Sequence, residues 1–282
     1  MKKILVPIDF SEHSTYATEV AADMAKTYDA EIIFLHMLGL SEAIFTRDES
    51  QSFLEAQFYM KLAKKRFKEF LDKPFLKNIK TSQTVQNYKV FEEVNAVAKE
   101  NNADLIVMGS HGSDGLSEIF VGSNTEKVVR TSEVPVLVIK RPSPDFKAER
   151  VVLGLDFQIE TMPAYHKAER FFASMKAEVH LVHVNLPGIK FMSTKEIQSK
   201  IDMFLGVAHH NGLPRNMQIA QISSYSVEEG MYNHAKNIDA DLISVITHGR
   251  KGLAHFFKGS IGEALANHTE LPVMTFKHNA AP

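Results

Sequence analysis

The chain of 282 residues contains neither cysteine nor tryptophan. Without cysteine it can form no disulfide bond, offer no thiolate nucleophile and hold no cysteine-ligated metal. This composition fits a reducing compartment, and we expect a cytoplasmic protein. The N-terminal apolar run at 4–8 is too short for the core of a secretion signal, and no stretch approaches the length of a membrane span.

The chain also lacks an excess of charge of one sign, because 32 basic residues nearly balance 34 acidic ones and give a formal net charge of −2. This balance provides no bulk attraction to nucleic acid or to an anionic membrane, and we expect neither as a partner. The basic helical run at 61–68 is interleaved with Phe67, and Phe70 and Leu71 follow it. This pattern indicates a solvated helix face beside a core stripe.

Several catalytic and binding motifs are absent as well. There is no P-loop of the form GxxxxGK[ST], no GxGxxG dinucleotide fingerprint and no GxSxG nucleophile elbow. His180 and His183 are spaced like a metal pair, but a step of three on a strand places them on opposite faces. We therefore assign no zinc site and no catalytic residue from the sequence.

The chain does contain a repeat, since four segments of the first half return in the same order in the second half. The paired segments are 4–10 and 151–157, 31–37 and 178–184, 103–108 and 240–245, and 133–140 and 270–277. Because order as well as composition is kept, two domains of one fold are predicted. The segment 141–145, which has two prolines, predicts the linker and gives domains at 1–141 and 149–282.

The repeated segments are short, nearly continuous apolar runs rich in branched residues, which is typical of strands buried on both faces. Helical patterns separate them, and the first helix has an apolar stripe at Ala17, Val20, Ala21, Met24 and Ala25. Strands that alternate with helices predict an α/β fold with a parallel, Rossmann-like sheet and helices on both faces.

The second helix of each half differs in length. The first half carries about ten extra residues around 41–88, which predicts a longer second helix and approach loop. Capping boxes predict the starts of these helices, at Ser52 with Glu55 and at Ser193 with Glu196.

Histidines occur at equivalent or neighbouring positions near the predicted strand and helix ends. His36 and His183 end the second strands, and we expect them to be packed or bonded to the backbone. His209 and His210 follow a helix, and we expect them to be solvated.

A glycine-rich segment follows the fourth repeated strand of each half. The first is 108–112 (MGSHG), followed by 122–125 (GSNT), and the second is 246–249 (ITHG), followed by 259–260 (GS). Glycine permits φ > 0 and a close approach of the backbone, and the N–H groups at a helix start attract anions. These segments predict a phosphate site, with turn glycines that bind nothing as the alternative.

An aspartate ends the first strand of each half, Asp9 in one and Asp156 in the other. Ligands of an open parallel sheet bind outside the carboxyl ends of the strands, where the strand order reverses. If strands one and four are neighbours, Asp9 faces the glycine segment, where it can bind a ribose hydroxyl or a magnesium ion carried by phosphates. The alternative is that Asp9 only caps the first helix.

Gly109, Gly112, Gly122 and Ser123 fill the pattern G-x2-G-x9-G-[ST], and on these residues the chain resembles the universal stress protein family. Segments 4–9 and 134–138 are also typical of that family, and the resemblance covers both halves. It implies a tandem member with two five-stranded sheets, each in the order 3-2-1-4-5.

Members of that family with this pattern bind ATP, with adenine near strands one and two. By position, the resemblance implies that Pro7, Asp9, His36 and Met37 hold adenine and ribose. It implies that the phosphates are surrounded by Gly109, Ser110, His111, Gly112, Gly122, Ser123 and Asn124. ATP is the expected cofactor, with AMP or ADP as alternatives and Mg bound through the phosphates.

The second half departs from the pattern, since Ile246 replaces the first glycine and Gly154 replaces the proline before the aspartate. A branched side chain at 246 would intrude on the phosphates or forbid the φ that glycine adopts. We therefore expect a second, weaker site at Asp156, His183, Gly249, Gly259 and Ser260.

The resemblance also implies dimerisation through the last strand of the domain. In a tandem chain the two domains can make this contact internally as a pseudo-dimer, with a further homodimer as an alternative. The expected function is that of a nucleotide-dependent sensor or regulator of the stress response, and not an enzyme. Two other functions stay open: a slow metal-dependent ATPase, for which no base can be placed, and a nucleotide-free interaction module or small-ligand carrier.

Overall fold

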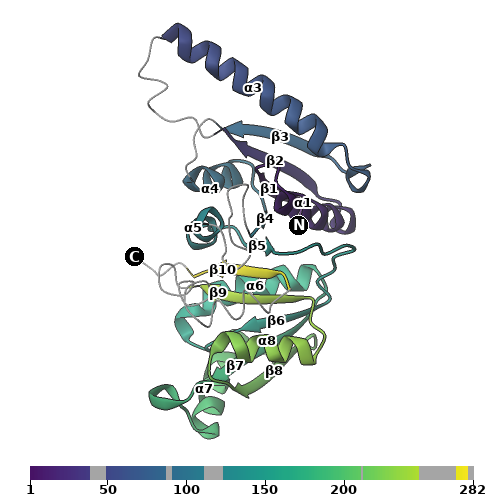
Figure 1. The fold of residues 1–282 in the computed structure, drawn as a ribbon. Helices are drawn as coiled ribbons and strands as arrows, with labels where there is room; N and C mark the ends of the chain where they lie inside the picture. Colours follow the sequence, from purple (N-terminus) through teal and green to yellow (C-terminus); the bar gives the residue numbers. More distant parts are fainter. Residues whose placement is uncertain (39–48, 87–90, 111–122, 211, 248–270, 279–282) are drawn as a thin grey trace. The chain divides into compact units, whose positions relative to one another are not determined.

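The computed structural model describes residues 1–38, 49–86, 91–110, 123–210, 212–247 and 271–278 (Figure 1). The chain divides into two compact units, and the boundary lies between Phe146 and Lys147. This boundary directly follows the segment 141–145, where the sequence predicts the linker.

The N-terminal unit is an alternation of strands and helices around one parallel sheet. Its elements are β1 (Lys3–Ile8), α1 (Glu12–Tyr28), β2 (Glu31–Met37), α3 (Glu49–Leu71), η1 (Pro74–Leu76), β3 (Thr81–Gln86), α4 (Phe91–Glu100), β4 (Leu105–Gly109), α5 (Ser123–Thr131) and β5 (Val136–Ile139). The strands follow the order β3-β2-β1-β4-β5, and each neighbouring pair is parallel.

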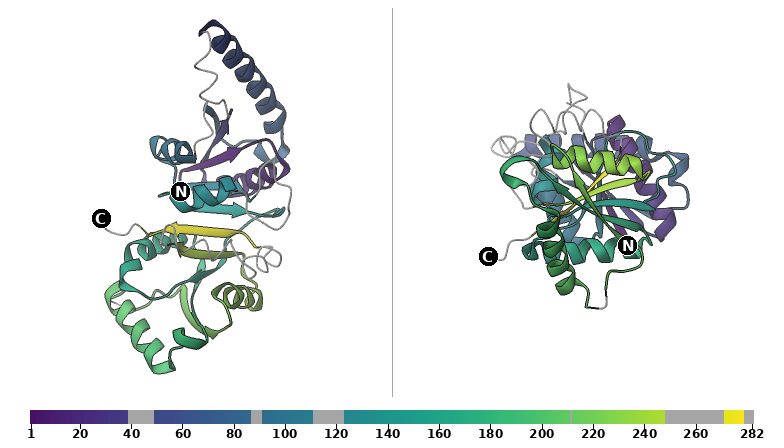
Figure 2. Two further views of the ribbon diagram at one scale, coloured as in Figure 1. Left: turned by 60° about the vertical axis from the view of Figure 1, so that its left-hand side comes forward. Right: turned by 90° about the horizontal axis from the view of Figure 1, so that it is seen from below.

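The C-terminal unit has the same arrangement. Its elements are β6 (Arg150–Gly154), η2 (Ile159–Thr161), α6 (Met162–Ser174), β7 (Glu178–Asn185), η3 (Gly188–Lys190), α7 (Thr194–Ala208), β8 (Met217–Ser223), α8 (Val227–Asn237), β9 (Leu242–Thr247) and β10 (Val273–Lys277). Its strands follow the order β8-β7-β6-β9-β10, again all parallel, and Figure 2 shows helices on both faces of this sheet. The predicted α/β fold with two tandem domains is confirmed.

The central strands form because their continuous apolar runs are covered on both sides. Ile4, Leu5 and Val6 of β1 are fully buried, and every residue of β4 is buried. Helix α1 covers one face with the predicted apolar stripe, all of whose residues are buried. The Ser14 N–H donates to the Ser11 side chain and thereby caps α1.

The second helix of each unit confirms one predicted start and corrects the other. Helix α7 begins at Thr194 behind a complete capping box of Ser193 and Glu196. Helix α3 begins at Glu49, so Ser52 lies inside the helix and the capping box predicted there is wrong. At 23 residues against 15, α3 is the longer helix, as the extra residues of the first half predict.

Helix α3 also shows the predicted division into a solvated and a buried face. Ala63, Phe67 and Phe70 are buried, whereas the basic residues of the run 61–68 are exposed. Among the described residues, neither α3 nor any other helix is long and apolar enough to span a membrane.

Candidate functional site

Strand pairing brings the predicted site residues of the N-terminal unit to one edge. β1 pairs with β4 through Ile4 with Leu105 and Leu5 with Ile106. Both strands run in the same direction, so Asp9, which follows β1, and Gly109, which ends β4, lie at the carboxyl edge of the sheet. The adjacency on which the predicted site depends is therefore present.

The carboxylate of Asp9 is held at the start of α1. Its Oδ1 accepts hydrogen bonds from the Ser11 N–H at 3.0 Å and from the Ser14 hydroxyl at 2.6 Å, while the Asp9 N–H donates to Ser14 Oγ at 3.1 Å. The alternative was that Asp9 only caps α1. The cap residue is Ser11, and Asp9 instead accepts the N–H of that cap residue. These bonds fix the direction of the carboxylate, and its contact with a nucleotide stays a prediction.

Phe10 is a site feature that sequence reasoning missed. Its φ is +67°, in the left-handed region that bulky residues rarely adopt. Its ring centroid lies 4.4 Å from that of His36, 5.4 Å from that of Phe67 and 5.6 Å from that of Phe70. The signal available in the sequence was the repeated pair Asp-Phe at the end of both first strands.

His36 is the backbone-bonded histidine that its position predicts. Its Nδ1 lies 2.9 Å from the carbonyl oxygen of Ile8 and donates to it, because a carbonyl oxygen only accepts. Pro7 and Met37 lie at or near the same carboxyl ends of β1 and β2 and are half-buried. Pro7, His36 and Met37, three of the four residues expected around adenine and ribose, thus lie near the carboxyl ends of β1 and β2. Asp9, the fourth, directly follows β1.

Gly109 is required by the protein's own helix α1. A Cβ built at this position would lie 2.8 Å from both Cβ and the carbonyl oxygen of His13 in the first turn of α1. Among the described glycines only Gly188 and Gly212 have a positive φ, so of the two reasons for a glycine at this strand end, positive φ and close backbone approach, Gly109 shows the second. Glycine stands here because strand and helix backbones approach closely.

Thr125 connects helix α5 to the end of β4. Its hydroxyl donates to the Gly109 carbonyl oxygen at 2.9 Å, and its side chain is buried. The Ser110 N–H donates to the Ile139 carbonyl oxygen at 2.9 Å, so that amide belongs to the sheet. Helix α5 begins at Ser123, as predicted, and Asn124 is exposed in its first turn.

The predicted residues His111, Gly112 and Gly122 lie outside the described residues. The same holds for Gly249, Gly259 and Ser260 of the second predicted site. Their contacts with phosphate therefore stay predictions.

The C-terminal unit repeats the arrangement around the aspartate. Asp156 Oδ1 accepts the Gln158 N–H at 3.2 Å, as Asp9 accepts the N–H two residues on. Phe157 has a φ of +53°, and its ring lies 6.2 Å from that of His183 and 5.5 Å from that of Phe204. Burial lowers the pKa of His183, which is also hydrogen-bonded to the backbone of Leu155.

Two positions of the C-terminal unit, Gly154 and Ile246, differ from their equivalents in the N-terminal unit. A Cβ at Gly154 would collide with the side chain of Met231 from α8, whose Cε would lie only 2.7 Å away. Ile246 is half-buried in β9. Helix α6 begins eight residues after β6, whereas α1 begins four residues after β1.

One histidine expectation is wrong. His209 was expected to be solvated, but its side chain is only 9% exposed. Its Nε2 lies 2.6 Å from the hydroxyl of Tyr165, and its Nδ1 lies 3.6 Å from Glu169 Oε1. The fully buried Tyr165 needs a hydrogen-bond partner for its hydroxyl, and His209 supplies it from the end of α7.

His180 and His183 have different neighbours, as opposite faces of a strand require. His180 contacts Glu178 and His234, whereas His183 contacts Phe157. Within the described part of the chain, no three metal-ligating side chains are grouped so that they could hold a metal ion.

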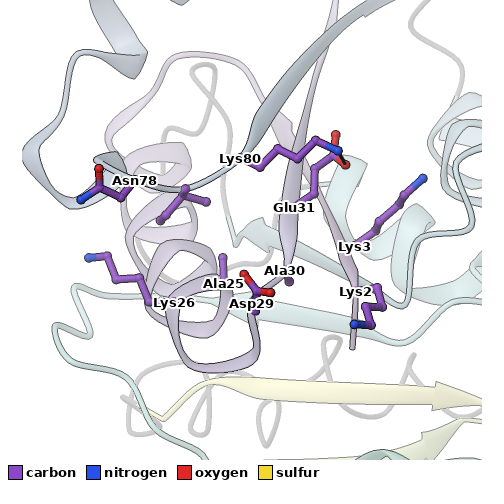
Figure 3. A pocket seen from close by; sticks show the side chains of 10 residues that line it. Lys2, Lys3, Ala25, Lys26, Asp29, Ala30, Glu31, Asn78 and Lys80 are labelled. Carbon is purple, nitrogen blue, oxygen red and sulfur yellow. Dashed lines mark hydrogen bonds and ion pairs between the residues drawn. The ribbon is translucent and has the colours of Figure 1, made fainter.

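A pocket of about 500 Å³ lies at the opposite, amino edge of the N-terminal sheet (Figure 3). Lys3, Glu31 and Lys80 line it from the starts of β1, β2 and β3, and the end of α1 closes one side. The Lys80 ammonium and the Glu31 carboxylate are 2.8 Å apart. None of the predicted site residues lines this pocket, so it is separate from the carboxyl-edge site.

Comparison with known proteins supports both the fold and the repeat. The sequence model of the Universal stress protein family matches residues 1–140 and again 147–277. Universal stress protein MJ0577 of Methanocaldococcus jannaschii is 34% identical over 157 residues, which cover 50% of this chain and 95% of that protein. Universal stress protein MJ0531 of the same organism is 31% identical over 151 residues, which cover 51% of this chain and 85% of that protein.

Among solved structures, a universal stress protein from Archaeoglobus fulgidus matches with a TM-score of 0.64 at 20% identity. The match covers 98% of this chain and 96% of that one, and it shows the same fold over both units. The chain belongs to the universal stress protein family, as a tandem protein with one such domain in each half.

Proposed function

We propose that the protein binds ATP at the carboxyl edge of its N-terminal sheet and acts as a nucleotide-dependent sensor or regulator of the stress response. The observation that carries this proposal is the hydrogen bond from Thr125 to the Gly109 carbonyl. It holds the amino end of α5 beside the end of β4, next to the strand that leads to Asp9. A helix amino end attracts phosphate through its N–H groups and dipole.

The chemistry of Asp9 fits the sugar end of a nucleotide. An ionised carboxylate only accepts hydrogen bonds, and the bonds from the Ser11 N–H and the Ser14 hydroxyl to Oδ1 hold the Asp9 carboxylate in one orientation. An oriented carboxylate at the end of β1 can accept hydrogen bonds from ribose hydroxyls, as acidic residues do in related sheets. The carboxylate oxygens of Asp9 could also coordinate a magnesium ion carried by the phosphates.

The arrangement favours binding over turnover. The Nδ1 proton of His36 is donated to the Ile8 carbonyl oxygen, so this nitrogen is not set to take a proton from an attacking water, which efficient hydrolysis requires. We accordingly propose a cytoplasmic binding protein and not an enzyme, with AMP or ADP as the other nucleotides to compare.

Calorimetry of the full chain with ATP tests the proposal. We expect one strong site per chain, together with a second site that is much weaker. Asp9→Asn should weaken the strong site, and Asp156→Asn, the matched change in the other unit, should leave it intact. Absence of any heat of binding, or two sites of equal strength, would contradict the proposal.

The identity of the resident ligand can be read directly. Mass spectrometry of the small molecules released from freshly purified protein should detect an adenine nucleotide. If no nucleotide is released and ATP does not raise the melting temperature, an interaction module without nucleotide becomes the better description.

A further inference from the structure

We propose that Phe10 is a positioning residue that connects Asp9 to helix α3, so that nucleotide binding at Asp9 is transmitted to that helix. The inference rests on the proposed function and extends it from binding to signal output. Its starting point is the left-handed backbone at Phe10, with a φ of +67°. Such a conformation at a bulky residue costs free energy and persists only where the surroundings enforce it.

The surroundings of the Phe10 ring are the end of β2 and the last turns of α3. The rings of Phe67 and Phe70 meet it edge-on, with interplanar angles of 84° and 77°. The guanidinium carbon of Arg66 lies 5.8 Å from the ring centroid. Three side chains of α3 therefore lie against one ring, which makes Phe10 a direct contact between the turn at Asp9 and this helix.

The residues on either side of Phe10 take part in the hydrogen bonds around the Asp9 carboxylate. Asp9 precedes it, and Ser11, which follows it, donates its N–H to Asp9 Oδ1 and caps α1. A ligand that engages the Asp9 carboxylate thus acts on the two residues that flank the strained one. Phe10 is the single residue between Asp9 and Ser11, so a movement of either neighbour reaches it directly.

The C-terminal unit, a repeat of the N-terminal one, keeps the same arrangement of aspartate, left-handed phenylalanine and second helix. Phe157 is also left-handed, follows Asp156 and packs on a phenylalanine of the second helix, Phe204 of α7. The two units differ elsewhere at this edge, at the positions of Ile246 and Gly154. A strained phenylalanine that recurs despite these differences indicates a required geometry and not an accident of one turn.

The test compares variants that separate the ring from the backbone. Phe10→Gly keeps the left-handed conformation available without strain and removes the ring. Phe10→Tyr keeps the ring and serves as the conservative variant. Phe157→Gly is the matched control, because it removes the equivalent ring from the other unit.

ATP affinity is measured by calorimetry on the full chain, and hydrogen exchange of residues 63–71 is measured with and without ATP. We expect ATP to slow exchange in this segment of the wild-type protein. Phe10→Gly should bind ATP about tenfold more weakly, the loss typical of one hydrogen bond to a charged group, and should lose the protection of α3. Phe10→Tyr should retain the wild-type ATP affinity and the protection of α3 by ATP. Phe157→Gly should leave the affinity and the protection unchanged.

The outcomes distinguish this inference from the proposed function. If the wild-type protein binds no adenine nucleotide, the proposed function fails and the inference fails with it. If the wild type binds ATP while Phe10→Gly binds equally well, or α3 exchange does not respond to ATP, only the inference is overturned. Should Phe10→Gly fail to fold, Phe67→Leu removes a partner ring from α3, and unchanged protection by ATP in that variant overturns the inference equally.

Discussion

Replacing Thr125 by valine tests the contact on which the nucleotide site depends. Valine has nearly the same shape as threonine but no hydroxyl, so the change removes the 2.9 Å bond to the Gly109 carbonyl without creating a large cavity. The carbonyl belongs to a buried residue, and leaving it without this donor should cost about 1–3 kcal/mol of stability. Helix α5 has only nine residues, so it depends on such tertiary contacts to hold its amino end.

Thr125→Ser is the matched variant, because it keeps the hydroxyl and loses one methyl group, worth about 0.8 kcal/mol when buried. Urea unfolding should therefore show a larger loss of stability for valine than for serine. Calorimetry should show ATP binding about tenfold weaker for valine and close to wild type for serine. If serine is as damaging as valine, or valine binds ATP normally, the hydrogen bond does not position the site.

Three further predictions address the surrounding structure. Gly109→Ala should destabilise the N-terminal unit by about 1–3 kcal/mol in thermal unfolding, because the new Cβ would lie 2.8 Å from His13; an unchanged melting temperature would show that α1 moves freely. Tyr165→Phe should cost about 1–2 kcal/mol in urea unfolding, because it removes the hydroxyl that bonds to His209, and a neutral result would deny that bond a stabilising role. Burial and a neighbouring histidine of β7 lower the pKa of His234 from its ordinary 6.5, so the unfolded chain takes up the proton more readily. The stability that neutral His234 contributes is present above pH 6.5 and is lost as the pH falls through the folded pKa. His234→Gln should therefore reduce the fall of the urea midpoint with decreasing pH. If the midpoint falls equally in the variant, His234 is not the cause of the fall.

The elements that sequence reasoning predicted well are those whose signals are local. The apolar stripe of α1, the capping box of Ser193 and the buried runs of β1 and β4 each depend on residues within a few positions of one another. Strand β3 carried no such signal, because its residues Thr81–Gln86 are mostly polar. It lies at the edge of the sheet, where one neighbour supplies the hydrogen bonds and a continuous apolar run is not needed.

In the candidate site, too, the residues with a local signal were predicted and the contacts between distant residues were not. Asp9 and Gly109 were predicted because each stands at a recognisable strand end, and parallel strands present their ends at one edge. The burial of His209 was not predicted, because its partner Tyr165 lies on a different helix, 44 residues away in the chain. Periodicity carries no information about contacts of that kind.

The sequence by itself determined the duplicated unit, its parallel sheet and the carboxyl edge at which the aspartates and glycines gather, because strand patterns and their order are written in short segments. Only the tertiary structure decided what those residues touch. Gly109 is a glycine because His13 of α1 lies against it, and Phe10 is left-handed while its ring contacts His36 and α3. These partners come from distant parts of the chain, and only folding brings them together.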